Sequence, residues 1–316
     1  MHVYRWDLDK TYLETDFESL RGLVRSAIEA AEAKRAVPGA TPLLRALAAP
    51  PANRIFILSG SPTQLREVLE RKLRIDGIRH EALILKDSLG QLRKGRVRAI
   101  KEQFGYKLPV LLSARAGLGR ACRETLFGDD AEVDALVYSL YADVVSGRVG
   151  ADAVARIMAA AGAYPDAIRR TLEAIDAVPT ADAVERIFIR VEKRRPPAVF
   201  SALGSRCVPV YSWWQAALVL HGAGHIDGEA AGRVLADVAQ GRGRGPWEMA
   251  ALTQDIVRRG HVAAEVLETV VGPAPLLDAS RRAVQKLGER PPPAAPKGPV
   301  QGADYVQLVR GWRDRG

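Results

Sequence analysis

The chain opens with MHVYRWDLDKT, residues 1 to 11, and this stretch decides the fold. Its first half is strand-prone, because Val, Tyr and Trp side chains favour a pleated, half-buried surface. Two aspartates, Asp7 and Asp9, follow directly. Side chains two residues apart on a strand point to the same side. We therefore predict a short first strand that ends in two carboxylates with a common direction.

Three further apolar segments are predicted to be strands. They are RIFILSG at 54–60, HEALILKD at 80–87 and TLF at 125–127. The first is apolar without alternation, as expected of a strand covered on both faces. Strands that alternate with helices imply crossover connections and a parallel sheet with helices on both faces. Ligands bind such sheets at the carboxyl ends of the strands, where the polar groups of this chain are predicted to lie.

Helices are predicted between these strands. A capping box of Thr15 and Glu18 begins a periodic segment over 16–34. Ser61 is expected to cap a helix over 62–74 that has proline at its first position. A later helix is expected to begin near Pro109, with Lys107 at its opening.

The second half of the chain differs from the first in composition and in predicted secondary structure. Beyond about residue 150 it is alanine-rich and predicted to be helical, including TADAVERIFIRVEK at 180–193. We therefore predict an α/β domain over 1–148, an all-α accessory domain over 149–289, and a proline-rich linker with a short C-terminal helix over 290–316. The sequence leaves open whether this last helix docks on the rest of the chain.

Composition narrows the class of protein. The formal charge of +9 and the pI near 9.7 favour anionic partners such as nucleic acid, anionic lipid or phosphorylated substrates. The longest apolar stretches are shorter than the roughly 20 residues of a membrane-spanning helix, and the N-terminus lacks the pattern of a signal peptide. Cys122 and Cys207 are far apart and are predicted to be small core residues. We expect a cytoplasmic location.

The carboxylates after the strands suggest phosphoryl transfer. Such chemistry needs a nucleophilic Asp, a second acid, a divalent cation, and cationic or hydroxyl contacts to the transferred group. Asp7 can attack phosphorus, and Asp9 can act as general acid and then as base. Clustering these two with Asp129, Asp130 and Asp134 is unfavourable without a counter-ion. Mg²⁺ is the predicted cofactor, because it prefers hard oxygen ligands.

Four segments, in order, resemble the four motifs of the haloacid dehalogenase superfamily of phosphatases. They are DLDKT (7–11), FILSGSP (56–62), YKL (106–108) and FGDDAEVD (127–134). More narrowly, KRAVPGATPLLRALA (34–48), ILSGSP (57–62), DGI (76–78), LKD (85–87), YKL (106–108) and the GDxxxxD form of GDDAEVD (128–134) look like the bacterial relatives of the actin-patch-associated phosphatidate phosphatase catalytic domain. The resemblance covers roughly residues 1 to 145. It implies a Rossmann-like, haloacid dehalogenase-type fold for the domain over 1–148.

The resemblance also implies roles for individual residues. Asp7 is the nucleophile, Asp9 the acid and base, Ser59 a phosphate contact, Lys107 the charge-neutralising lysine and Asp129 the principal metal carboxylate. The full predicted sets are Thr11, Ser59, Gly60 and Lys107 for phosphate, and Asp7, Asp9, Asp129, Asp130 and Asp134 for metal.

Several of these assignments have alternatives. Lys86, Lys94 and Lys101 compete with Lys107 for the role of the lysine, and the sequence does not decide which of Asp130 and Asp134 contacts the metal. Structural roles are also open: Ser59 as a turn cap, Lys107 as a solvated helix-start lysine, and Asp134 as a charge at a helix N-terminus.

Two features of the helical half are predicted to be structural. His221 and His225 stand four residues apart, but no third ligand accompanies them and glycines interrupt the helix, which argues against zinc. Trp213 and Trp214 are predicted to be core residues.

The sequence thus predicts a Mg²⁺-dependent phosphatase that hydrolyses a phosphomonoester through an aspartyl-phosphate. The substrate class is a phosphatidate-like lipid at an anionic membrane surface or another anionic phosphomonoester. The alternatives are a nucleic-acid-end phosphatase, a phosphotransferase or mutase, and a catalytically weak metal-binding scaffold that works through its helical half. Oligomeric state and protein partners of the helical half are not predicted.

Overall fold

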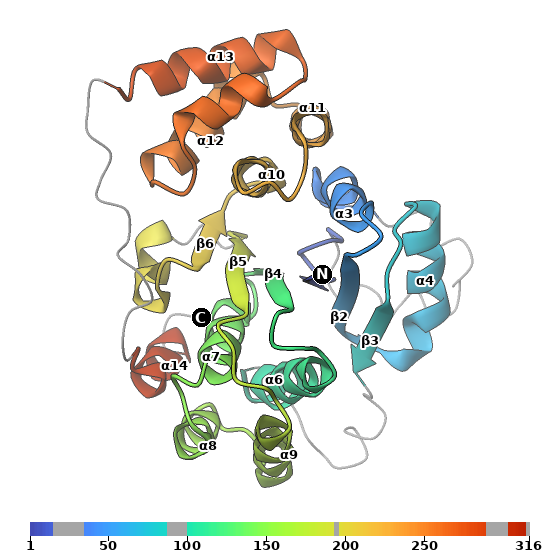
Figure 1. The fold of residues 1–316 in the computed structure, drawn as a ribbon, viewed down its shortest axis with the longest axis vertical. Helices are drawn as coiled ribbons and strands as arrows, with labels where there is room; N and C mark the ends of the chain where they lie inside the picture. Colours follow the sequence, from blue (N-terminus) through green and yellow to red (C-terminus); the bar gives the residue numbers. More distant parts are fainter. Residues whose placement is uncertain (15–34, 87–99, 193–195, 289–302, 314–316) are drawn as a thin grey trace.

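The computed structural model of the protein describes residues 1–14, 35–86, 100–192, 196–288 and 303–313. Six parallel strands form one sheet in the order β3-β2-β1-β4-β5-β6 (Figure 1). The strands are β1 (His2–Asp7), β2 (Arg54–Pro62), β3 (Ala82–Lys86), β4 (Arg123–Asp129), β5 (Val184–Arg190) and β6 (Cys207–Val210). The predicted parallel α/β sheet is confirmed.

Helices cover both faces of this sheet. The chain order is α3 (Ala40–Ala48), η2 (Thr63–Leu65), α4 (Arg66–Ile75), α6 (Ile100–Ala116), α7 (Asp134–Val145), α8 (Ala151–Ala160), α9 (Pro165–Asp176), η3 (Pro197–Leu203), α10 (Trp213–Gly222), α11 (Gly228–Arg242), α12 (Pro246–Arg258), η4 (Ala264–Thr269), α13 (Ala274–Gln285) and α14 (Tyr305–Arg313). Apolar side chains of α3, α4, α10 and α11 pack together in one core, and those of α6, α7, α8 and α14 pack in a second.

The sheet extends beyond the predicted boundary at residue 148. Residues 184–190, predicted to be helical, are strand β5, and β6 follows as the edge strand. The helical prediction for this segment is wrong. Its run Ile187, Phe188 and Ile189 is buried on both sides, which is the pattern of a central parallel strand rather than of one helix face. The helical C-terminal region that was predicted is confirmed for α10 to α13 (Figure 1).

The predicted helix starts also need correction. β2 continues through Pro62, and Ser61 does not cap the next helix, because its hydroxyl bonds to Asp9 instead. Pro109 lies inside α6 rather than at its start, so Lys107 lies mid-helix. Proline is costly there, but the leucines on either side of it are fully buried, so packing holds the helix together. The predicted helix over 16–34 lies outside the described residues.

The C-terminal helix α14 docks on the α/β part. Tyr305 donates a hydrogen bond to Asp143 of α7 at 2.6 Å, and the Trp312 ring packs edge-on against Phe200 at 5.9 Å between centroids. Figure 1 shows α14 beside α7 and α8. The predicted linker over 290–302 lies outside the described residues.

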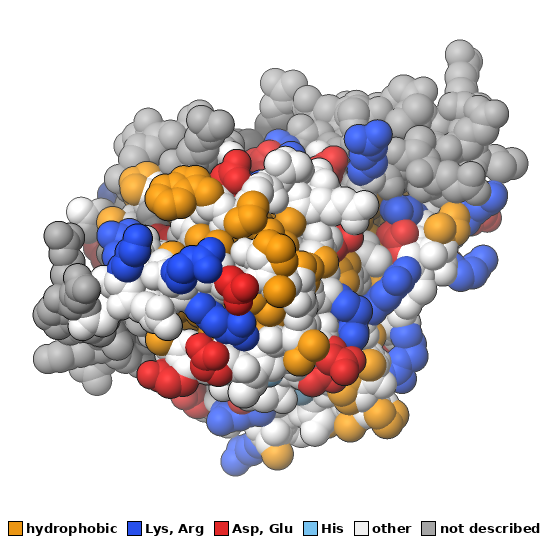
Figure 2. Space-filling model, turned by 90° about the horizontal axis from the view of Figure 1, so that it is seen from above, with side chains coloured by type: hydrophobic (Ala, Val, Ile, Leu, Met, Phe, Trp, Pro, Cys, Tyr) orange, Lys and Arg blue, Asp and Glu red, His pale blue; other side chains and the backbone are white. Residues whose placement is uncertain are grey.

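The helical end of the molecule, α11 to α13, has a surface of mixed charge. Figure 2 looks onto this end and shows Lys and Arg interspersed with Asp and Glu around a band of hydrophobic side chains. Trp213 and Trp214 are buried, as predicted, and so are Cys122 and Cys207. Within the described ranges, no helix is both long and apolar enough to cross a membrane.

Candidate active site

The predicted polar residues meet at the carboxyl edge of the sheet because β1 lies between β2 and β4. Asp7, the last residue of β1, pairs in register with Leu58, so Ser59 lies one step beyond it on β2. On the other side Trp6 pairs with Phe127, which puts Asp129 two residues further along β4. Parallel pairing therefore brings together residues that are about 50 and 120 positions apart in the sequence.

Lys107 contacts three carboxylates in this site. Its ammonium donates to Asp7 Oδ1 at 2.8 Å, to Asp134 Oδ1 at 2.5 Å and to Glu132 Oε2 at 3.0 Å. Lys107, Asp7 and Asp134 are buried, whereas Glu132 is half-buried. The second oxygen of Asp7, Oδ2, is buried and has no hydrogen-bond partner among the described residues. One cation thus faces three carboxylates.

Asp9 lies in the turn after β1 rather than on the strand itself. Its Oδ2 accepts hydrogen bonds from Ser59 at 3.0 Å and from Ser61 at 3.2 Å. The turn is tight, since Leu8 O accepts from the amides of residues 12 and 13, and Lys10 adopts a left-handed backbone conformation with φ of 58°. The prediction that Asp9 continues the strand is therefore wrong, although its carboxylate does reach the same edge.

Asp129 is anchored by the turn that follows β4. Its Oδ1 accepts from the amide of Ala131 at 2.7 Å, and its Oδ2 accepts from the Thr11 hydroxyl at 3.0 Å. Gly128 precedes it, and a Cβ there would lie 2.5 Å from Oδ2 of Asp134. Only glycine leaves room for the Asp134 carboxylate, which gives a physical reason for the glycine in the GDxxxxD segment.

Burial and crowding shift the pKa values of these groups upward. Burial and the nearby carboxylates raise the pKa of Asp7 well above its ordinary value, although Lys107 opposes the shift. Burial, followed by Asp134 and Glu132, raises the pKa of Asp129 to about 8. Burial and Glu132 likewise raise the pKa of Asp134 to about 6, although Lys107 opposes this shift.

The pKa values of Asp9 and Lys107, which belong to the same site, are also raised. Burial and Glu132 raise the pKa of Asp9 to about 6, against the hydrogen bonds from Ser59 and Ser61. Burial disfavours the charge on Lys107, but the surrounding carboxylates raise its pKa well above the usual value. The site therefore contains more negative charge than its own lysine neutralises.

Gly60 and Asp130 are the remaining residues of the predicted site. Gly60 stands between the two serines that bond to Asp9. Asp130 is buried, and its Oδ1 accepts from the amide of Glu192, two residues beyond β5. The sequence left open which of Asp130 and Asp134 contacts the metal. Of these two, the structure brings Asp134 into hydrogen-bond contact with Lys107.

Of the three competing lysines, Lys86 is placed away from the cluster. Lys86 ends β3, which is separated from β1 by β2. Lys94 lies outside the described residues, as does the side chain of Lys101. Sequence reasoning missed Glu132. The only signal for this residue is its position between the predicted Asp130 and Asp134 in the acidic segment GDDAEVD.

The oxygen atoms at this edge suit a hard divalent cation. Oxygens of Asp7, Glu132 and Asp134 lie within 4.8 Å of one another. Carboxylates grouped in this way, with a surplus of negative charge, are the donor set that Mg²⁺ prefers.

The parallel sheet and the carboxylates, lysine and hydroxyls at its carboxyl edge define an α/β protein with a site of the kind that handles phosphate groups. Residues 6–154 match the family model of the catalytic domain of phosphatidate phosphatase APP1. This family is one of phosphoric monoester hydrolases, so the prediction of an enzyme of this class is confirmed. The match covers a little under half of the chain and ends within α8. No curated protein and no solved structure shows significant similarity to the chain.

Proposed function

We propose that this chain is a Mg²⁺-dependent phosphatase that uses Asp7 as its nucleophile. The observation that carries the proposal is the asymmetry of the Asp7 carboxylate. Lys107 holds one oxygen at 2.8 Å, whereas the other is buried without a donor among the described residues and is free to form a bond. A carboxylate held in this way is oriented for attack before the substrate binds.

The proposed reaction has two steps. In the first, Asp7 Oδ2 forms a bond to phosphorus, the bond from phosphorus to the leaving oxygen breaks, and Asp9 gives its proton to that oxygen. In the second, Asp9 takes a proton from water, the water oxygen attacks phosphorus, and the bond to Asp7 breaks to give inorganic phosphate. The pKa of Asp9, raised to about 6 by burial and Glu132, suits a group that gives and takes a proton near neutral pH.

Other residues would position the phosphoryl group. The hydroxyls of Ser59 and Thr11 lie at the same edge as Asp7, and Lys107 supplies a fixed positive charge. The carboxylates of Asp7, Asp134 and Glu132, with Asp129 beside them, would hold the cation. When bound, Mg²⁺ would neutralise the negative charge on the phosphoryl oxygens.

We further propose a phosphatidate-like lipid as the substrate class. The family match supports it, and so does one surface feature. Trp247, the second residue of α12, is 82% exposed, and it follows Arg242, which ends α11, and Arg244, which lies in the connection between the two helices. Arg242 pairs with Glu14 at 3.1 Å, which ties this connection to the loop that follows Asp9. An exposed Trp beside arginines suits the headgroup region of an anionic membrane.

The test is release of inorganic phosphate with Mg²⁺ from three substrates at equal concentration. They are phosphatidate in mixed vesicles, a small chromogenic phosphomonoester and a 5′-phosphorylated oligonucleotide. We expect release that EDTA and Asp7→Asn both abolish, with phosphatidate the best substrate. Preference for the oligonucleotide would support the nucleic-acid-end alternative.

Two outcomes would overturn the proposal. Absence of turnover on all three substrates with Mg²⁺ would favour the scaffold alternative. Transfer of phosphate to an alcohol acceptor, with little inorganic phosphate released, would favour a phosphotransferase. Asp278→Asn, at an exposed position of α13, is the matched control for Asp7→Asn.

A further inference from the structure

A second group of metal-ligating side chains lies at the opposite edge of the sheet. His2 begins β1, Glu185 is the second residue of β5, and His225 lies in the connection between α10 and α11. One ligand atom from each residue lies within 4.8 Å of the other two. Since Asp7 ends the strand that His2 begins, roughly 17 Å of β1 separates this group from the active site.

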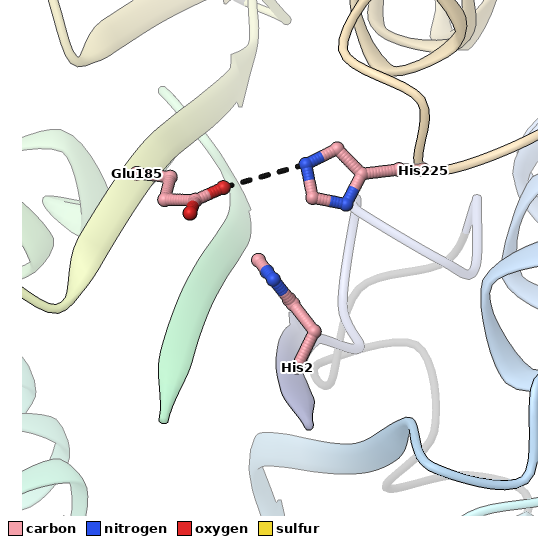
Figure 3. A group of neighbouring side chains, drawn as sticks. All are labelled: His2, Glu185 and His225. Atoms are coloured by element: carbon pink, nitrogen blue, oxygen red, sulfur yellow. Dashed lines mark ion pairs between the residues drawn. The ribbon is translucent and has the colours of Figure 1, made fainter. Parts of the chain in front are cut away.

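The three side chains converge from separate elements. Figure 3 shows the Glu185 carboxylate and the His225 ring pointing at each other, with the His2 ring rising from β1 between them. His225 Nε2 lies 3.4 Å from Glu185 Oε2, and the two imidazole rings are 4.7 Å apart between centroids. Two imidazoles and one carboxylate are a common donor set for Zn²⁺ and related divalent ions, leaving a fourth position for water.

Hydroxyl groups hold the other ring nitrogens of both histidines. His2 Nε2 is hydrogen-bonded to Thr125 Oγ1 at 2.9 Å, and His225 Nδ1 is hydrogen-bonded to Tyr4 OH at 2.9 Å. These contacts leave Nδ1 of His2 and Nε2 of His225 as the nitrogens for a metal. Partners of this kind fix the tautomer and the orientation of the ring in metal sites.

The surroundings of His2, Glu185 and His225 allow a metal ion to reach the group but limit its affinity for a cation. A pocket of about 410 Å³, lined in part by Glu185, His225 and Ala223, opens beside the group. Arg123 also lines it and pairs with Glu185 Oε1 at 3.1 Å, which leaves Oε2 for another partner. The nearby guanidinium reduces the attraction for a cation, so binding in the micromolar range is expected rather than the tight binding of a structural zinc site.

We propose that His2, His225 and Glu185 form a binding site for a divalent transition-metal ion of the Zn²⁺ type. The site links the start of β1 and β5 to the connection that leads into the C-terminal helices, so occupancy would stabilise the contact of the helical region with the sheet. It needs no part of the proposed phosphatase chemistry.

The test uses the full chain without an affinity tag, in excess Mg²⁺, which occupies oxygen sites and competes poorly for imidazole. Calorimetry with Zn²⁺ is expected to give one equivalent bound, and Co²⁺ is expected to give a visible absorption spectrum of low-coordinate nitrogen and oxygen ligation. Zn²⁺ is also expected to raise the melting temperature, and EDTA to reverse this rise.

His225→Gln and Glu185→Gln are each expected to weaken Zn²⁺ binding at least tenfold, while His80→Gln, outside the group, leaves it unchanged. Glu185→Gln serves as the second variant because it replaces a partly exposed carboxylate by an amide of the same shape and leaves the core intact. Zn²⁺ binding that is absent in the wild type, or that survives in both variants, would overturn the proposal. Because activity is not a readout, failure here is distinguishable from failure of the phosphatase proposal.

Discussion

Lys107 Nζ lies 2.8 Å from Asp7 Oδ1, and this pair joins the middle of α6 to the end of β1. The same ammonium also contacts Asp134 and Glu132. Because the pair is buried, its geometry fixes the Asp7 carboxylate and leaves Oδ2 without a donor among the described residues. One lysine therefore has two consequences: it orients the proposed nucleophile, and it makes the folded state tolerate a carboxylate cluster.

Lys107→Met is expected to lower stability as well as activity. Removal of one partner from a buried charged pair leaves uncompensated carboxylates, which costs about 3–5 kcal/mol of unfolding free energy. The loss should be largest at pH 8 and smaller at pH 5, where protonation neutralises the carboxylates. Urea denaturation at the two pH values measures it, with exposed Lys286→Met as the control. An equal loss at both pH values would contradict this account.

Asp7→Asn is expected to abolish phosphate release while preserving the fold. The amide keeps the shape of the side chain but is a poor nucleophile, so kcat should fall about 10³-fold or more. The chromogenic phosphomonoester assay measures the fall, and circular dichroism checks the fold. Activity within tenfold of the wild type would remove Asp7 from the role of nucleophile.

The edge of the sheet that carries the site could be predicted because its signals are local. Asp7 and Asp129 each follow a short apolar segment directly, and parallel strands bring such ends together. The sequence could not show that β1 ends before Asp9, because the turn depends on a left-handed Lys10. Nor could it place the lysine within its helix, because buried packing overrides the preference of proline for helix starts.

The missed features depend on contacts between distant parts of the chain. The sequence predicts a helix at β5 because its alanine-rich flanks resemble the helices around it, whereas pairing with β4 makes this segment a strand. His221 bonds to Ile226 O and Thr269 Oγ1, so it is not a member of the group that His225 forms with His2 and Glu185. The partners of His225 are about 40 and 220 positions away, beyond any motif.

Gly128→Ala is expected to lower kcat without unfolding the protein. The new Cβ would lie 2.5 Å from Oδ2 of Asp134, 2.7 Å from its Cβ and 2.8 Å from the Tyr138 ring, so Asp134 and Tyr138 must shift from their positions beside Lys107. Displacement of a site residue by about 1 Å can cost about 100-fold in rate. Steady-state kinetics measure the effect, and Gly117→Ala is the matched control because a Cβ there meets nothing within 4 Å. Equal kcat in the two variants would show that the position of Asp134 does not matter.

Without a divalent cation, stability is expected to fall as pH rises from about 5 to 8. The folded-state pKa values of Asp9 and Asp134, about 6, and of Asp129, about 8, exceed the ordinary value of 3.8. The folded state therefore binds more protons than the unfolded chain over this range, and stability from these groups is lost as pH passes through the raised values. Mg²⁺ should reduce the loss by taking the place of the protons.

Melting temperatures in EDTA and in Mg²⁺ at pH 5, 6, 7 and 8 measure this effect. Asp129→Asn removes one of the raised groups, so its slope in EDTA should be flatter than that of the wild type by a few degrees across the range. Charges elsewhere in the chain affect both proteins alike and cancel in the comparison. The same slope for the two proteins would refute the assignment of the pH dependence to this cluster.

Trp247→Ala is expected to separate action at a membrane from the chemical step. The side chain is 82% exposed and lies in the first turn of α12, so it is available to a bilayer without contributing to the core. Its loss should lower activity on phosphatidate vesicles about 3- to 10-fold, since interfacial Trp contributes on the order of 1 kcal/mol. Activity on the small soluble phosphomonoester should stay unchanged. Vesicle sedimentation measures binding directly, and Arg244→Ala should weaken binding most at low salt, so that binding depends less on salt concentration. An equal fall on both substrates would mean that Trp247 supports the fold or the active site rather than a membrane contact.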